Sequence, residues 1–241
     1  MYVEVDNARL WVEDEGAGPP ILFVHGGLGD SRLWEPVAAQ LVDSFRCVRY
    51  DLRFWGRSTG PAEPFSFVRD AVGVLDALEI ERAALVGLSM GGGTALDVAL
   101  AHPERVTALV HVAAGMSGRP VDVYTKEQQA YENELDADLE VWAALGADAR
   151  IRELWQATPE AQGYPEEAEP AREPAADPSR LRVPVLVLVA KHDPPAQQEV
   201  GRALAAEAPN AELVEVDSDH YLTIRKPHEV ADHIRRFLSA S

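Results

Sequence analysis

The stretch that decides the fold is Val86-Gly87-Leu88-Ser89-Met90-Gly91-Gly92. It follows a short apolar run at residues 83–86 and precedes a helical pattern that continues to Ala101. A strand that turns sharply into a helix leaves the Ser89 hydroxyl at the tip of a sheet, and small neighbours are needed because bulky ones would collide with adjacent chain. The helix N-terminus behind Ser89 favours negative charge. This setting is typical of a nucleophilic serine, although a glycine-rich turn without chemistry would carry the same letters.

A serine hydroxyl is a weak nucleophile, so a base must take its proton and a third group must orient that base. Asp193 follows the apolar run at 183–190, and His220 comes just beyond the run at 212–216. The carboxyl ends of parallel strands meet at one edge of a sheet, where open α/β sheets place their sites. We therefore predict that Ser89 is the nucleophile, His220 the base and Asp193 the carboxylate that orients the base.

Other interpretations of these residues stay open at this point. Asp193 alone fits a loop-capping carboxylate equally well. His192 adjoins Asp193, yet it points the other way if the segment is extended. His111 falls inside a predicted strand, where we expect it to pack in the core. The histidines that we expect to be solvated at helix starts or faces are His102, His228 and His233.

Short apolar runs alternate with helical patterns along most of the 241 residues. This alternation predicts an α/β protein with an eight-stranded, mostly parallel sheet flanked by helices, in which the first two strands are antiparallel. The expected strands are residues 2–5, 10–12, 21–24, 46–50, 83–86, 106–112, 183–190 and 212–216. The expected helices begin near Trp34, behind a cap at Ser66, at Met90, around Val200 and at Pro227.

The alternation of apolar runs and helical patterns stops after Ala114. Residues 115–180 contain no convincing strand and are rich in Glu, Ala and Asp, with prolines toward their end. A stripe of apolar side chains at helical spacing predicts a helix, and a second short helix is expected around Ile151, Leu154 and Trp155. The stripe consists of Tyr131, Leu135, Leu139, Trp142 and Leu145. We therefore expect a core domain at 1–114 and 181–241, with a short helical lid at 115–180 inserted after the sixth strand.

A second strand end bears on the chemistry. His25-Gly26-Gly27 closes the run at 21–24. A tetrahedral intermediate concentrates charge on the former carbonyl oxygen, which backbone N–H groups can hold. Met90 offers one such N–H group, and Gly27 or Leu28 offers the other. The side chains that we expect around the substrate are His25, Met116, Trp142 and Trp155.

Composition excludes several classes of function. Forty acidic against 22 basic side chains give a net charge of −18, which repels phosphate backbones and anionic lipid surfaces, so we expect neither nucleic acid nor a membrane as partner. The single cysteine, Cys47, excludes an internal disulfide and a cysteine-based zinc cluster, and we expect no metal site. No leader sequence or long apolar run is visible, which favours the cytoplasm.

Gly27-Leu28-Gly29 mimics a dinucleotide fingerprint, but Arg32 replaces the third glycine, so no cofactor is expected.

Taken together, these motifs resemble the α/β-hydrolase fold enzymes, in particular small ester and lactone hydrolases such as 3-oxoadipate enol-lactonases and the esterase/perhydrolase group. The resemblance covers nearly everything outside the lid. By motif, it implies a triad of Ser89, Asp193 and His220 and oxyanion donors at Gly27 and Met90, with Leu28 possible. A serine nucleophile argues against the similar haloalkane dehalogenase and epoxide hydrolase branches, which use aspartate there. The residues that carry the resemblance are His25-Gly26-Gly27, Tyr50-Asp51-Leu52-Arg53, Gly56-Arg57-Ser58, residues 86–92, His102-Pro103-Glu104-Arg105-Val106, Asp193-Pro194 and Asp219-His220.

The sequence thus predicts a cofactor-free serine hydrolase that cleaves a small carboxylic ester or lactone through an acyl-enzyme. A C–C bond hydrolase or a cofactor-free perhydrolase on the same triad is the alternative, as is a ligand-binding receptor with slow turnover. Two departures from the family pattern bear on the site. Phe54-Trp55 follows Arg53 where the family usually has glycine, so this loop either takes a different path or fills part of the pocket. Asp219 precedes the predicted base, and a carboxylate there would favour the protonated imidazole.

Overall fold

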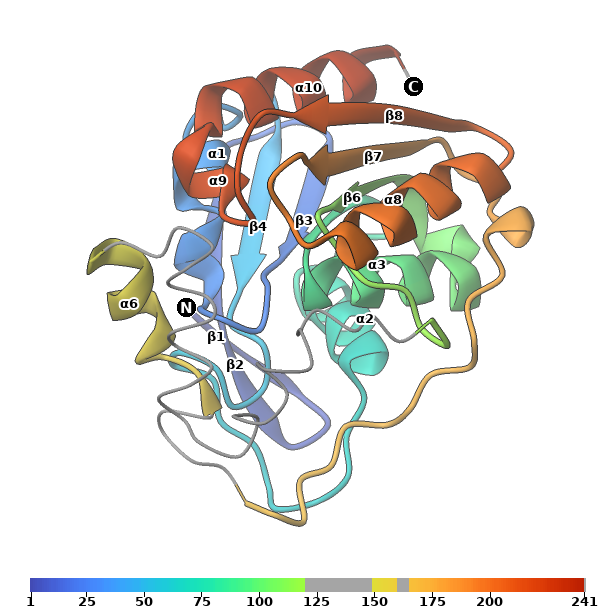
Figure 1. Ribbon diagram of the computed structural model, residues 1–241. Helices are drawn as coiled ribbons and strands as arrows, with labels where there is room; N and C mark the ends of the chain where they lie inside the picture. The colour runs from blue at the N-terminus through green and yellow to red at the C-terminus, as the bar shows by residue number, and fades with distance from the viewer. Residues whose placement is uncertain (120–148, 160–164, 241) are drawn as a thin grey trace.

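The computed structural model describes residues 1–119, 149–159 and 165–240. Eight strands form one sheet in the order β1-β2-β4-β3-β5-β6-β7-β8, as the alternation predicts (Figure 1). The strands are β1 (Tyr2–Val5), β2 (Ala8–Glu15), β3 (Pro20–Val24), β4 (Arg46–Tyr50), β5 (Ala83–Leu88), β6 (Val106–Val112), β7 (Val185–Ala190) and β8 (Ala211–Val216).

The strands β4, β3, β5, β6, β7 and β8 lie side by side in this order and are parallel to one another. β1 and β2 form the antiparallel part, at the edge of the sheet opposite β8. β1 and β2 form a hairpin through Asp6 and Asn7, whose φ angles of 45° and 62° are typical of such a tight turn. β2 also pairs antiparallel with β4. β2 exceeds the predicted residues 10–12 at both ends, because residues 8–9 pair with β1 and residues 13–15 pair with β4. Asp14 lies 2.7 Å from the Arg46 guanidinium, and Glu13 lies 2.7 Å from that of Arg49.

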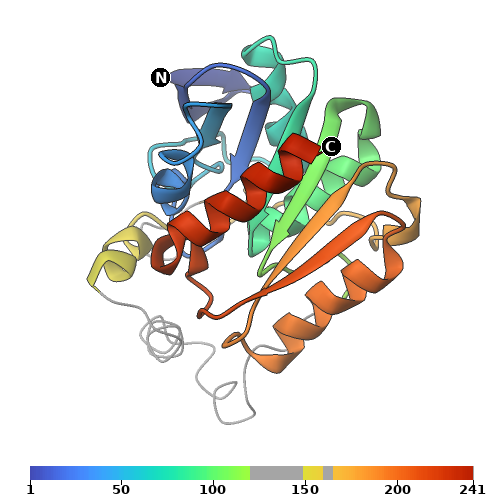
Figure 2. The ribbon, with the colours of Figure 1, turned by 90° about the horizontal axis from the view of Figure 1, so that it is seen from above.

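Helices cover both faces of the sheet (Figure 2). Side chains of α2 (Phe67–Ala77), α3 (Met90–Ala101) and α8 (Pro195–Glu207) pack in one core, and those of α1 (Glu35–Ala38), α9 (Leu222–Arg225) and α10 (Pro227–Ala240) pack in a second. The predicted cap is confirmed, because the Ser66 hydroxyl accepts the Arg69 N–H at the start of α2. α8 begins five residues before the expected position, since Pro195 occupies its first turn, where proline is tolerated.

The chain between β6 and β7 holds α6 (Ala149–Trp155), as the apolar spacing around Ile151 predicts. Within residues 113–119, 149–159 and 165–184, no segment joins the eight-stranded sheet. The stripe from Tyr131 to Leu145, with Trp142, lies outside the described residues. Backbone hydrogen bonds tie this region to the core: Gly56 N–H donates to Ala157 O at 2.7 Å, Phe65 N–H donates to Glu169 O at 3.1 Å, and Ala171 N–H donates to Phe65 O at 2.6 Å. No helix among the described residues is long and apolar enough to span a bilayer.

Candidate active site

Ser89 lies at the turn between β5 and α3, in a strained backbone conformation with φ 53° and ψ −122°. The turn depends on its glycines. A Cβ on Gly87 would lie 2.2 Å from Gly91 O, and one on Gly91 would lie 2.3 Å from Val24 O. Strain at a non-glycine residue persists only where the surroundings impose it, and such residues cluster at functional sites. Here β5, α3 and the hydrogen bond from Ser89 N–H to Val112 O at 3.0 Å hold the turn.

Asp193 and His220 meet at the carboxyl ends of β7 and β8. His220 Nδ1 lies 2.9 Å from Asp193 Oδ1 and 3.1 Å from Oδ2, and both side chains are buried. An ionised carboxylate only accepts hydrogen bonds, so Nδ1 carries the proton in this pair. In the neutral ring, Nε2 is then the atom that can accept a proton. Asp193 thus fixes the tautomer that a general base needs.

Contacts with the loop after β8 and with α8 hold the loop that carries Asp193. His192 N–H donates to Ser218 O at 3.1 Å, which ties the loop after β7 to the loop after β8. Gln198, in the first turns of α8, donates through Nε2 to Asp193 O at 2.7 Å. Sequence reasoning did not single out Gln198, because nothing in its local pattern indicates a bond to the loop five residues earlier. The His192 side chain lies at the surface and pairs with Asp217 at 2.9 Å, consistent with the expectation that it points away.

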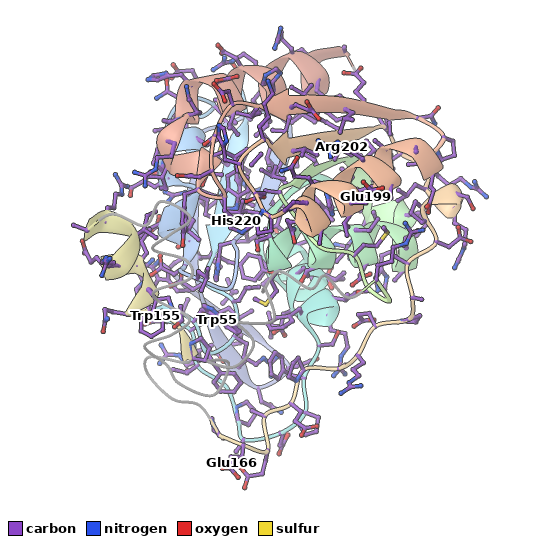
Figure 3. All side chains as sticks on the ribbon, in the orientation of Figure 1. Trp55, Trp155, Glu166, Glu199, Arg202 and His220 are labelled. Carbon is purple, nitrogen blue, oxygen red and sulfur yellow. The ribbon has the colours of Figure 1, made fainter. Side chains whose placement is uncertain are left out.

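Ser89 and His220 line the same cavity, which has a volume of about 890 Å³. Met90 and the predicted pocket residue Met116 line it too, together with Gln197 from the first turn of α8. His220 lies toward the middle of the molecule in Figure 3, whereas Glu166 lies at its lower tip. The folded chain therefore brings the predicted nucleophile and the Asp193–His220 pair to one cavity at the carboxyl edge of the sheet.

The loop after β3 lies directly against the nucleophile turn. A Cβ on Gly26 would be 3.1 Å from Ser89 Cβ, and one on Gly27 would be 3.8 Å from Met90 Sδ. The Trp55 indole Nε1–H donates to Gly27 O at 2.7 Å, and Trp55 packs edge-on against Phe67 at a centroid distance of 5.8 Å. The sequence marked Trp55 only as a departure from the family pattern. In the fold it anchors the loop that carries the predicted oxyanion donors.

His25 lies outside this cavity, contrary to the sequence expectation, and it is fully buried beneath the loop. Leu52 N–H donates to its Nε2 at 2.9 Å, so its Nδ1 carries the proton and donates to Gly26 O at 2.8 Å. Burial lowers the pKa of His25, which keeps the ring neutral. The residue thus links two backbone segments, at Gly26 and Leu52.

Neither of the two tryptophans that we expect around the substrate, Trp142 and Trp155, lines the cavity in the part of the chain that the structure describes. Trp155 is buried on α6 and is not among the described residues that line the cavity. Trp142 lies outside the described residues.

The structure also explains the two departures from the family pattern. Phe54 adopts φ 72°, the left-handed region that glycine enters freely, so the loop keeps a glycine-like backbone there with a bulky residue. Its ring packs edge-on against Phe65 at 5.5 Å. Asp219 accepts the Tyr221 N–H at 3.0 Å and pairs with Arg225 at 3.3 Å. The Asp219 carboxylate is therefore balanced by a guanidinium close to it.

Asp51, just after β4, is fully buried and holds backbone groups of two loops. It accepts Ser31 N–H at 3.0 Å and Arg57 N–H at 2.9 Å. Burial by itself would raise the pKa of Asp51, but these hydrogen bonds and the nearby charges hold it below its usual value. The carboxylate thus fastens two loops to the end of β4.

Comparison with known proteins agrees with this geometry. The profile of the alpha/beta hydrolase fold matches residues 19–227, and the chain belongs to this family. Among solved structures, the enol-lactonase from Burkholderia xenovorans LB400 superposes with a TM-score of 0.78 at 26% identity, covering 99% of this chain and 100% of the lactonase.

Two curated relatives carry other hydrolase names. The 2-hydroxymuconate semialdehyde hydrolase of Pseudomonas sp. (strain CF600) is 45% identical over 118 residues, which is 45% of this chain and 41% of the relative. The epoxide hydrolase of Caballeronia sordidicola is 32% identical over 161 residues, or 58% of this chain and 47% of the relative. The chain thus spans less than half the length of either relative.

Proposed function

We propose that this protein is a cofactor-free serine hydrolase that cleaves a small carboxylic ester or lactone through an acyl-enzyme. The observation that carries the proposal is the buried Asp193–His220 pair, at 2.9 Å, on the cavity that the strained Ser89 also lines. An imidazole and a serine hydroxyl on one cavity, with a carboxylate bonded to the imidazole, are the parts that nucleophilic acyl transfer requires.

The reaction proceeds in two stages. Ser89 Oγ attacks the substrate carbonyl carbon while His220 Nε2 takes the serine proton, and Asp193 stabilises the imidazolium that forms. The oxyanion receives hydrogen bonds from Met90 N–H, at the start of α3, and from Gly27 or Leu28 N–H. His220 then protonates the leaving alkoxide, which departs. Water, deprotonated by His220, attacks the acyl-enzyme and releases the acid and Ser89.

The enol-lactonase, which matches this chain over its whole length, supports an ester or lactone substrate. The semialdehyde hydrolase supports a second candidate, hydrolysis of a C–C bond on the same three residues, because its 45% identity is higher although it covers less of the chain. A panel of p-nitrophenyl esters, lactones and dienone substrates separates the two. We expect turnover of esters or lactones, and dienone cleavage without esterase activity would favour the second candidate instead.

The Trp55 anchor gives a separate prediction about the oxyanion hole. In a planar trans peptide the N–H group points opposite to the C=O group, so Trp55, by holding Gly27 O, also orients Leu28 N–H. Trp55→Phe keeps the ring and removes the donor. We expect it to lower kcat about tenfold with little change in KM, less than the roughly 100-fold or greater loss of a direct oxyanion donor.

Trp34→Phe is the matched control for this measurement. The Trp34 indole donates to Val24 O at 2.9 Å, so this variant also deletes one buried indole–carbonyl bond, but at a β3 residue. We expect a similar loss of thermal stability in the two variants, with kcat close to wild type for Trp34→Phe. Equal kcat losses would show that Trp55 acts through stability alone.

A further inference from the structure

The cavity extends away from Ser89 along one face of α3. Met90, Gly93, Thr94 and Asp97 line it, and their spacing of three, one and three residues places them on the same side of the helix. Asp97 is eight residues after Ser89, a separation of about 12 Å at the rise of an α-helix. The cavity therefore joins the predicted nucleophile to a carboxylate a short acyl chain away.

Asp97 is a buried carboxylate, and the described part of the chain pairs no cation with it. It is 8% exposed, and Ser117 Oγ, from the loop after β6, donates to its Oδ2 at 2.6 Å. Within the described residues, no Lys, Arg or His forms an ion pair with Asp97. The charge that acts on it is negative and comes from Glu173, which accepts a hydrogen bond from Ser66 Oγ at 3.0 Å.

The surroundings do not compensate this charge. Burial and, to a smaller extent, the Glu173 charge together raise the pKa of Asp97 to about 6, against the opposing hydrogen bond from Ser117. Arg119, on the same cavity, pairs with Glu207. Arg172 also lines the cavity, but its side chain is exposed and forms no ion pair with Asp97. A buried carboxylate left without a cation destabilises a fold, and perturbed groups of this kind cluster in functional sites.

We propose that Asp97 binds a cationic group of the substrate, so that the preferred ester or lactone carries a protonated amine at the far end of its acyl chain. The proposal rests on the function proposed above and adds the substrate class to it. An ammonium group supplies the missing positive charge and can donate to the Asp97 oxygen that Ser117 leaves unused. An organic cation fits better than a metal ion, because no group of three or more His, Cys, Asp or Glu in the described parts of the chain is arranged to hold one.

Two esters of equal length test the proposal. p-Nitrophenyl 8-aminooctanoate and p-nitrophenyl nonanoate differ only in an ammonium replacing a methyl group, and the chain length suits the separation along α3. At pH 7 we expect the wild type to favour the amino ester at least tenfold in kcat/KM, expressed mainly in KM. Asp97→Asn should bring the ratio toward one, whereas Glu169→Gln, which removes a charge from the exposed rim of the same cavity, should keep it. A wild-type ratio of one or below overturns the proposal.

A binding measurement separates this proposal from the proposed function. Calorimetry with octylammonium, with 1-octanol as the neutral comparison, needs no turnover and can be made on wild type, Ser89→Ala and Asp97→Asn. We expect octylammonium to bind at least tenfold more tightly than octanol to the first two and equally to the third. If no ester is hydrolysed but this pattern appears, the hydrolase proposal fails and the cation site stands. Equal affinities in the wild type overturn the cation site whatever the catalytic result.

Stability gives a readout that a purely structural Asp97 would not reproduce. The pKa of Asp97 is higher in the fold than in the unfolded chain, so the folded state binds the proton more tightly. The stability that this proton contributes is fully present below the ordinary aspartate range near pH 4 and is lost as pH rises through about 6. Asp97→Asn should therefore have an unchanged or higher Tm at pH 7.5, and its advantage over wild type should vanish toward pH 4. A lower Tm at pH 7.5 would mean that the ionised carboxylate supports the fold, which contradicts the proposal.

Discussion

Replacing Ser89 with alanine is expected to lower kcat on p-nitrophenyl butyrate by about 10⁴-fold or more, because the nucleophile of an acyl-enzyme mechanism has no substitute in the site. The fold should survive. Alanine meets the same backbone strain at φ 53° as serine does, and the surrounding glycines remain. The measurement is the steady-state rate of p-nitrophenolate release, with the thermal unfolding midpoint recorded in parallel.

Ser218→Ala is the control for the first prediction. Ser218 lies two residues before His220, and its buried hydroxyl forms no hydrogen bond among the described residues. Its removal should leave kcat within about threefold of wild type and leave Tm nearly unchanged. If Ser89→Ala keeps a tenth or more of the wild-type kcat, Ser89 is not the nucleophile.

Replacing Asp193 with asparagine is the second prediction with a large effect. We expect kcat to fall by about 10³- to 10⁴-fold, since an amide can donate to His220 Nδ1 and so favours the tautomer that cannot accept the serine proton. The side chain keeps its size, so the cavity should keep its shape, and KM should change far less than kcat. The kinetic constants on one ester and the Tm of each variant are the measurements.

The chain supplies a matched control in a second Asp–His pair. Asp217 and His192 are also 2.9 Å apart, but both side chains are largely exposed and neither lines the cavity. Asp217→Asn should leave both kinetic constants unchanged, because an exposed pair of this kind contributes little to stability or chemistry. Comparable losses in Asp193→Asn and Asp217→Asn would refute a specific orienting role for Asp193.

Much of the fold could be predicted because local patterns determine it. α3 begins at Met90 and ends at Ala101 as predicted, since the glycine-rich turn fixes its start and apolar spacing carries it to the position before His102-Pro103. The Asp6-Asn7 turn and the Ser66 cap follow from side-chain chemistry in the same few residues. The meeting of Asp193 with His220 is less local, but parallel strands bring their carboxyl ends to one edge whatever the loops contain.

The roles that depend on partners far along the chain could not be predicted. His25 looks like a pocket residue by position, yet a hydrogen bond from Leu52, 27 residues away, fixes it beneath the loop. Trp55 and Gly27 are 28 residues apart, and no periodicity indicates their bond. Asp97 lies within the predicted helix at residues 90–101, whose apolar pattern indicates only packing in the core. Only the packing of α3 against the cavity shows that its carboxylate is buried with no cation paired to it among the residues that the structure describes.

The most direct test of the central claim is the site of covalent labelling by a fluorophosphonate, determined by peptide mass mapping of the wild type and the Ser89→Ala variant. The proposed mechanism predicts one adduct, on the peptide that contains Ser89, with loss of esterase activity in proportion to labelling and no adduct in the variant. An adduct on any other residue, or sustained ester turnover after Ser89 is fully labelled, would contradict it.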